Sequence, residues 1–166
     1  MSNNHPRGMV VPASTVFLVE IADDDRITAF GLFLEAFTAV SARIEHELHE
    51  AAGISGAEFG VLLRLARTPG HHLRMTDLAD ASGLSTSGMT RLVDRLVAAG
   101  LVERAACPND RRGLEAVLTA KGRKLVEKVL PAHLDSLERY IAGPLCGELD
   151  KLAAPMRLLR DSAKSR

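Results

Sequence analysis

Residues 74–118 read RMTDLADASGLSTSGMTRLVDRLVAAGLVERAACPNDRRGLEAVL. The stretch begins with two segments of helical periodicity on either side of Gly83, and it ends with two strand-like runs around a Pro-Asn-Asp turn. Thr76 is placed to cap a short helix over Asp77–Ala81, and Gly83 is placed to end that helix in a left-handed conformation. We therefore expect two short helices, a turn, and a two-stranded ribbon with a basic tip.

The second of these helices is expected to begin after Ser85, a good N-cap residue, and to end before Gly100. At about 100° per residue, its apolar residues fall on one face; they are Met89, Leu92, Val93 and Leu96. The opposite face carries small polar or charged residues, namely Thr86, Ser87, Thr90, Arg91 and Asp94. Such a face can approach base edges closely, and the first amides of the helix can bind a phosphate.

Gly88 stands inside the first turn of this helix, where glycine costs roughly 1 kcal/mol relative to alanine. Close approach of the backbone, either to DNA or to the preceding helix, explains such a glycine. After the helix, Leu101–Arg104 and Leu114–Leu118 predict a β-hairpin with a long tip that carries Arg111 and Arg112.

A long helix is expected upstream, from about Arg26 to Ala51, and it carries an apolar stripe in a heptad pattern. The stripe consists of Ile27, Phe30, Leu34, Phe37, Ile44 and Leu48. A small DNA-reading domain cannot cover so long a stripe, so dimerisation is the economical interpretation. The next helix begins with a capping box, Ser55 and Glu58, and ends at Pro69-Gly70.

Two helices are expected downstream of the hairpin. Thr119 caps the first, which runs to about Tyr140 and should kink at Pro131. The second runs from about Leu145 to Leu159, where Pro155 kinks or splits it.

The composition is that of a globular protein rather than a membrane or secreted one. The chain has 166 residues, 46% hydrophobic and 25% charged, enough for one domain with a core. We find no run of 18 apolar residues and no secretion signal, and two cysteines make no disulfide framework. We therefore expect a cytoplasmic protein with reduced thiols and no contact with a membrane.

The net charge is zero, but the charges are unevenly distributed. Residues 1–50 carry three basic and eight acidic side chains, whereas residues 64–112 carry eight basic and five acidic ones, and all eight are arginine. Arginine is favoured for phosphate and base recognition, so this distribution is compatible with a DNA-binding segment in an otherwise neutral chain.

The order of elements resembles the multiple antibiotic resistance regulator (MarR) family of winged helix-turn-helix repressors. The resemblance is carried by LRMTDLADASGLSTSGMTRLVDRLVAAGLVER (residues 73–104), NDRRGLEAVLTAKG (109–122) and EFGVLLRLA (58–66), and it extends over about residues 27–159. It implies a mainly α fold with a small β-wing, in which a winged helix-turn-helix is combined with interlocking dimerisation helices. The arm would cover residues 1–25 and the single domain residues 26–166, with dimerisation helices at 26–52 and 119–162 and the winged helix-turn-helix at 55–118.

The resemblance also implies which residues contact DNA. The helix after Ser85 would enter the major groove, with Ser85, Thr86, Ser87, Thr90, Arg91 and Arg95 facing the DNA. Arg112 would enter the minor groove, Asp110 would brace it and pair with Arg95, and Arg111 would contact phosphate. The partners implied are double-stranded DNA and a second copy of the chain, on a pseudo-palindromic site with half-sites about 10 bp apart.

A small aromatic or anionic effector is the ligand class that the resemblance implies, in a pocket whose lining would include Phe33, Phe37, His46, Phe59 and Leu63. For each of these residues plain core packing is the competing interpretation. No cofactor is expected. His46 and His49 have a usable metal-ligand spacing but no further ligand motif, so no metal site is predicted. Cys107, near Arg104, is the better of two weak candidates for a redox-sensing thiol.

The sequence therefore predicts a sequence-specific DNA-binding regulator, a ligand-responsive homodimeric repressor. The alternative is a dimeric interaction module or anti-repressor that keeps the fold without binding DNA, and the neutral net charge is its support. An enzyme is not expected, because we find no nucleophile–base pair and no Gly-rich phosphate loop.

Overall fold

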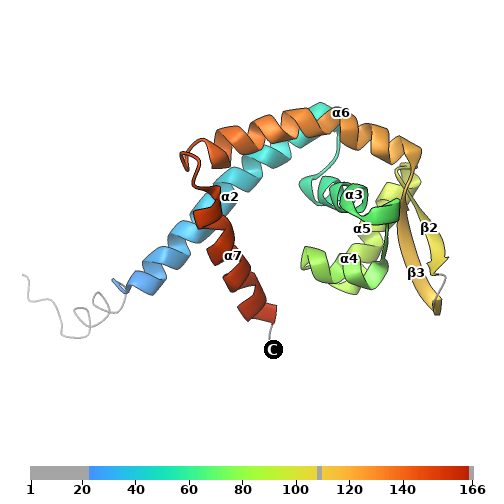
Figure 1. Cartoon of the computed structure of the whole chain (residues 1–166), viewed down its shortest axis with the longest axis horizontal. Helices are drawn as coiled ribbons and strands as arrows, with labels where there is room; N and C mark the ends of the chain where they lie inside the picture. The colour runs from blue at the N-terminus through green and yellow to red at the C-terminus, as the bar shows by residue number, and fades with distance from the viewer. Residues whose placement is uncertain (1–22, 108–109, 165–166) are drawn as a thin grey trace, which may run out of the picture. The chain divides into compact units, whose positions relative to one another are not determined.

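The computed structural model describes residues 23–107 and 110–164 (Figure 1). The chain forms two compact units, residues 1–39 and residues 40–166. Most of the expected N-terminal arm lies outside the described residues. Helix α2 (Asp25–Ala52) begins in the first unit and ends in the second, within one residue of the predicted bounds.

The apolar stripe of α2 is exposed over its first half. The side chains of Phe30 and Phe37 are 61% and 63% exposed, and Leu48, near the C-terminal end, is the buried residue of this helix. By length and composition alone, α2 is also the one described helix that could cross a membrane, with a mean hydropathy of 1.4 over its most apolar window, none of it buried. The exposed apolar stripe and the high mean hydropathy both indicate that this half of α2 requires an apolar surface to cover it.

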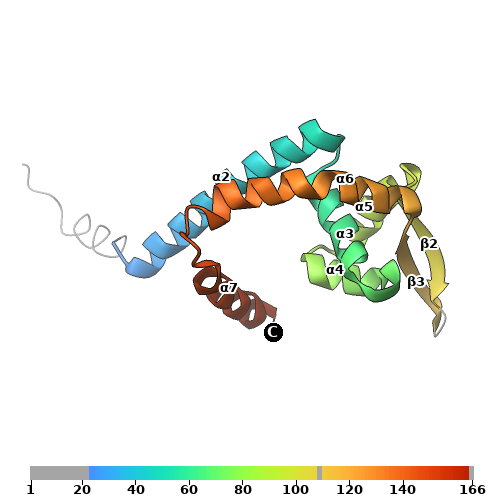
Figure 2. The ribbon, with the colours of Figure 1, turned by 45° about the horizontal axis from the view of Figure 1, so that its top comes forward.

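Three helices and a sheet form the core of the second unit. Helices α3 (Gly56–Arg67), α4 (Met75–Ser82) and α5 (Thr86–Ala98) cluster beside the hairpin of strands β2 (Val102–Cys107) and β3 (Asp110–Leu118) (Figure 2). Their inward faces supply the largest fully buried side chains, among them Phe59, Leu62, Leu78, Met89 and Leu96. The amphipathic pattern of each helix therefore accounts for how it packs.

The caps of these helices agree with the sequence except at one position. The Ser55–Glu58 capping box is formed at the start of α3, and Gly83 adopts a left-handed conformation (φ 65°) at the end of α4. Thr76 does not cap α4, because the helix begins at Met75 with Arg74 as a cap residue that makes no side-chain bond. The expected threonine cap is therefore wrong.

The sheet has three strands in the order β1–β3–β2, one more than the predicted hairpin. Strand β1 (His72–Arg74) follows the short 3-10 turn η1 (Pro69–His71) and pairs antiparallel with β3 (Asp110–Leu118). Strand β2 (Val102–Cys107) also pairs antiparallel with β3, with a register shift between Ala106 and Cys107. The hairpin is therefore longer and more irregular than the sequence predicted.

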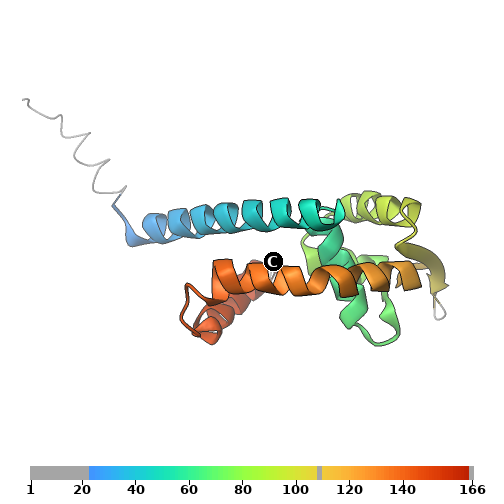
Figure 3. The ribbon, with the colours of Figure 1, turned by 90° about the horizontal axis from the view of Figure 1, so that it is seen from above.

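Helix α6 (Ala120–Leu137) begins at the Thr119 cap, as expected, and runs through Pro131. Gly122 lies so close to the Leu101 carbonyl that a Cβ there would collide with it, which seats the start of α6 on the hairpin. The helix continues as a π-turn, η2 (Glu138–Ala142). Figure 3 shows the end of α2 running beside α6.

Helix α7 (Leu149–Lys164) starts four residues later than predicted, after a turn with left-handed Cys146 and Gly147. It is continuous through Pro155, so of the two expected outcomes, a kink or a split, the split does not occur. Its outer surface exposes Leu149, Leu158 and Leu159.

Candidate nucleic-acid interface

The N-terminus of α5 is formed as the sequence predicted. The Ser85 hydroxyl accepts a hydrogen bond from the Gly88 amide at 3.1 Å and lies 3.2 Å from the Ser87 hydroxyl. A Cβ on Gly88 would lie 3.2 Å from the Ser85 hydroxyl oxygen, with Leu84 the next neighbour. Within the chain, Gly88 therefore leaves room for the cap, and packing against α4 does not explain it.

The two faces of α5 have opposite characters. Met89, Leu92, Val93 and Leu96 are buried, as predicted. On the other side the predicted contact residues are gathered over the first turns of the helix: Ser85, Thr86, Ser87 and Arg91 are exposed and Thr90 is half-buried. The Thr90 hydroxyl donates to the Thr86 carbonyl at 2.9 Å. The result is a shallow polar surface with one long cation, Arg91, which forms no ion pair among the described side chains.

Arg95 lies further along α5, and its partner is one that the sequence did not predict. Its Nε donates to Glu58 Oε1 on α3 at 2.9 Å, and the side chain of Arg95 stays 60% exposed. The expected partner, Asp110, belongs to β3, but its side chain lies outside the described residues, as do those of Arg111 and Arg112.

A second ion pair joins α5 to the hairpin. Arg104 on β2 lies 3.0 Å from Asp94 Oδ1 and also donates to the Thr90 carbonyl at 3.4 Å. No local sequence pattern predicts this pair, because its residues belong to different elements. It fixes the base of the hairpin against the middle of α5, so that the hairpin and the helix can act as one surface.

The residues predicted for an effector pocket are not brought together in the second unit. Phe59 is buried in the core, where it makes an edge-to-face contact with His133, and Leu63 packs against the same core. Phe33 and Phe37 belong to the first unit, where both are exposed. His46 alone among the five lines the groove found between α2 and α6.

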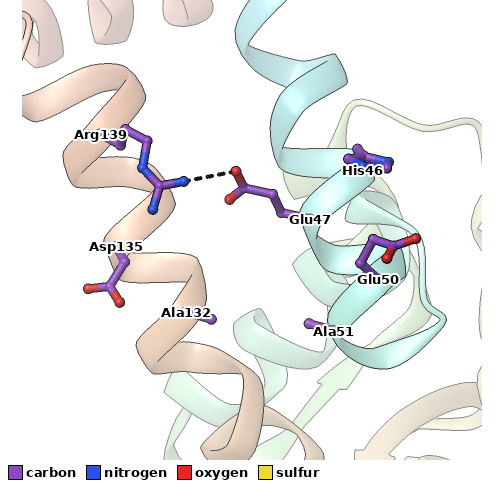
Figure 4. A pocket seen from close by; sticks show the side chains of 7 residues that line it. All are labelled: His46, Glu47, Glu50, Ala51, Ala132, Asp135 and Arg139. Atoms are coloured by element: carbon purple, nitrogen blue, oxygen red, sulfur yellow. Dashed lines mark hydrogen bonds and ion pairs between the residues drawn. The ribbon is translucent and has the colours of Figure 1, made fainter.

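That groove has a volume of about 580 Å³ and is open to solvent (Figure 4). Its charged lining consists of Glu47, Glu50, Asp135 and Arg139 together with His46. Glu47 and Arg139 point toward each other across it, with 3.1 Å between Oε1 and Nη1.

Glu47 ties α2 to the far end of α6. Its carboxylate accepts hydrogen bonds from the Ser136 hydroxyl, from the Tyr140 hydroxyl at 2.6 Å and from Arg139. The bonds from Ser136 and Tyr140 hold the pKa of Glu47 below its ordinary value. The carboxylate therefore stays ionised and holds α2 on α6 where the π-turn begins.

The two cysteines and the histidines were weighed in the sequence as a redox sensor and as metal ligands. Cys107 is buried, so it does not meet the requirement for an exposed redox thiol, and the interpretation of Cys107 as a redox sensor is wrong; Cys146 is the exposed cysteine. Within the described residues no group of three His, Cys, Asp or Glu side chains is arranged to hold a metal ion.

Comparison with known proteins connects this geometry to one group of regulators. A model described as the MarR family matches residues 52–113. The transcriptional repressor MprA of Escherichia coli K12 is 32% identical over 114 residues, which make up 69% of this chain and 65% of MprA. The chain thus spans about 65% of the length of the first curated relatives that it matches.

Two solved structures from Streptomyces coelicolor extend the likeness to nearly the whole fold. AbsC, a MarR family transcriptional regulator, is 30% identical with a TM-score of 0.80, covering 86% of this chain and 97% of AbsC. Sco3205, a MarR family transcriptional regulator solved in complex with DNA, is 28% identical with a TM-score of 0.76, covering 98% of this chain and 94% of Sco3205.

Proposed function

The chain belongs to the MarR family of transcription regulators, and on that premise we propose that it is a homodimeric, ligand-responsive repressor that binds a pseudo-palindromic operator. The observation that carries the proposal is the polar, arginine-bearing first half of α5, exposed on a helix whose other face is buried in the core. The Sco3205 structure contains DNA, which supports the same function for this fold.

In this proposal α5 enters the major groove with its N-terminus toward the bases. Ser85, Thr86, Ser87 and Thr90 are short enough to let the helix approach the base edges, and Arg91 can reach a guanine or a phosphate. The cap at Ser85 leaves amides at the start of α5 directed at the DNA backbone. Phosphate contacts supply most of the affinity and make it depend on salt.

The hairpin supplies a second contact. Arg112 is proposed to enter the minor groove, where a narrow groove strengthens the attraction for arginine, with Asp110 bracing it and Arg111 on a phosphate. The support for this comes from the observed hairpin, which is fixed to α5 through Arg104 and Asp94.

A second copy of the chain is proposed to cover the exposed apolar residues of α2 and α7. Phe30 and Phe37 on α2, and Leu158 and Leu159 on α7, are more than half exposed, and a stripe of this kind is covered economically by a second copy. A dimer would present two copies of α5 to successive major grooves, about 10 bp apart.

An aromatic or anionic small molecule is the proposed effector class. It would act by binding the conformation that does not fit DNA more tightly than the one that does. We propose that the protein works in the cytoplasm, where DNA and such effectors meet.

The proposal is tested by fluorescence anisotropy with DNA from upstream of the gene, at several salt concentrations. We expect one fragment, the operator duplex, to bind far more tightly than random duplexes, with affinity that falls steeply as salt rises. Absence of binding at low salt, or binding that ignores salt, would contradict the proposal and favour the interaction module that keeps the fold without binding DNA.

A further inference from the structure

Arg95 is held by one edge of its guanidinium and exposed at the other. Its Nε donates to Glu58 at 2.9 Å, while no described residue engages its two terminal nitrogens. An arginine bound through Nε has its side chain restrained along most of its length, and the N–H groups on the other edges of its guanidinium point away from the carboxylate. Arg95 therefore presents two ordered donors at the surface of α5.

Glu58 is itself fixed from three directions. One carboxylate oxygen accepts from the Ser55 amide at 2.9 Å and from the Ser55 hydroxyl at 3.0 Å, and the other accepts from Arg95. Burial raises the pKa of Glu58, but the hydrogen bonds from Ser55 and Arg95 together exceed that effect and hold the pKa below its ordinary value. The carboxylate is therefore ionised and accepts hydrogen bonds at both of its oxygens.

The start of α3 is in turn fixed to α2. The Gly56 amide donates to Glu45 Oε2 at 2.6 Å, and Phe59, one turn further along α3, is buried in the core. A continuous set of contacts thus runs from Glu45 on α2, through the cap of α3, to Glu58 and then to Arg95 on α5. The three helices that these contacts join, α2, α3 and α5, each bury at least one apolar side chain in the core.

We propose that Glu58 is a positioning residue that fixes Arg95 as a clamp for a DNA phosphate beside the major groove. The proposal rests on the function proposed above. Arg95 lies in the last turn of α5, whereas bases are read near the N-terminus of such a helix, so the backbone is the DNA group within its reach. Because the side chain is already ordered, little rotamer freedom is lost when it binds.

A positioning role also explains why a carboxylate, Glu58, stands beside a DNA-facing arginine, which simple charge attraction does not. A carboxylate next to a DNA-facing arginine weakens the attraction to phosphate, so a protein that needed only positive charge here would lack Glu58. Held orientation is useful only where the protein docks in one register, as on an operator. Glu58 therefore weakens the attraction of Arg95 to any DNA phosphate but orients Arg95 for the phosphate it meets on the operator.

The experiment compares Glu58→Gln, Arg95→Lys, Arg95→Ala and wild type on the operator duplex and on a random duplex, across a salt series. Arg67→Ala is the matched control, because Arg67 is an exposed arginine in the last turn of α3. Glutamine can keep the capping box but cannot form the ion pair. Thermal unfolding of each variant accompanies the binding data.

For Glu58→Gln we expect the operator affinity to fall about tenfold, a loss of roughly 1.4 kcal/mol. Affinity for the random duplex should be unchanged or higher, and the salt dependence unchanged. For Arg95→Ala both affinities should fall, and the slope of log affinity against log salt should decrease by about 1. Arg95→Lys, which leaves the cap of α3 intact, should keep the slope and lose operator affinity several-fold.

An unchanged ratio of operator to random affinity in both Glu58→Gln and Arg95→Lys would overturn the proposal, as would an unaltered salt slope in Arg95→Ala. A merely structural ion pair would lower the melting temperature and both affinities together. If wild type and Arg67→Ala bind the operator normally, and Glu58→Gln and Arg95→Lys leave the ratio of operator to random affinity unchanged, the positioning role fails and the repressor function stands. If wild type binds no duplex, the function itself fails.

Discussion

Helix α5 and the first half of α2 differ in where their packing partners lie. The apolar face of α5 is buried within its own chain, and ion pairs to Glu58 and Arg104 fix its flanks. The first half of α2 carries an equally regular apolar stripe, but Phe30 and Phe37 remain exposed. The first is therefore a finished local surface, whereas the second stays exposed and needs a further apolar surface to cover it.

The largest expected effect comes from charging the exposed stripe. The double variant Phe30→Asp, Phe37→Asp should abolish dimerisation, because two unpaired carboxylates would be buried in the interface. Sedimentation velocity at micromolar concentration should show a monomer, with Thr28→Asp, on the other side of α2 at about 100° per residue, as the control. A dimer that survives the double change would mean that another surface forms it.

A substitution in the core beneath α5 should lower the stability of each chain and not the affinity of the dimer. Leu62 is completely buried, so Leu62→Ala should lower the free energy of unfolding by about 2–5 kcal/mol. Phe30→Ala, measured by urea denaturation at several protein concentrations, should act through dimer affinity, so its effect should depend on protein concentration. A concentration-independent loss for both residues would remove the contrast between the two regions.

A smaller effect is expected at the start of α5. Ser85→Ala should lower the free energy of unfolding by about 1 kcal/mol, because the Gly88 amide loses its acceptor. The measurement is thermal unfolding without DNA, with Ser82→Ala, an exposed serine at the end of α4, as the control. Equal melting temperatures for both variants would show that the cap contributes nothing to stability.

The smallest effect is a pH dependence that originates at His133. Burial lowers the pKa of His133, and its Nδ1 is buried with no hydrogen-bond partner among the described residues. The pKa of His133 is lower in the folded chain than in the unfolded chain. The stability that neutral His133 contributes is therefore complete above about pH 6.5 and is lost as the pH falls from there through the lower, folded pKa. His133→Gln should flatten the dependence of the melting temperature on pH between about 7 and 5, and His49→Gln, an exposed control, should not.

Sequence patterns predicted the parts of this fold that depend on neighbours a few residues apart. The Ser85 cap, the buried face around Met89 and the Ser55–Glu58 box all follow from spacings of three or four residues, and the structure has each of them. The Thr76 cap fails because the chain enters α4 two residues earlier, from strand β1, whose pairing with β3 is a long-range contact.

The missing features depend on contacts between elements. Arg95 and Glu58 are 37 residues apart, and Arg104 reaches Asp94 from a strand, so no helical or strand period brings either pair together. Cys107 is buried next to the register shift after Ala106, and a shift of this kind changes which face a residue occupies. The effector pocket was predicted from a resemblance, and of its three residues in the second unit, Phe59 and Leu63 pack in or against the core whereas His46 lines the open groove.

The measurement that tests the central claim most directly is selection of bound duplexes from a random pool by the full chain. We predict an enriched pseudo-palindrome whose half-sites are centred about one helical turn, roughly 10 bp, apart, because two copies of α5 are presented by one dimer. Arg91→Ala should recover a less specific sequence at the positions that this arginine reads. Enrichment of a single, unrepeated half-site, or of no sequence at all, would contradict the account.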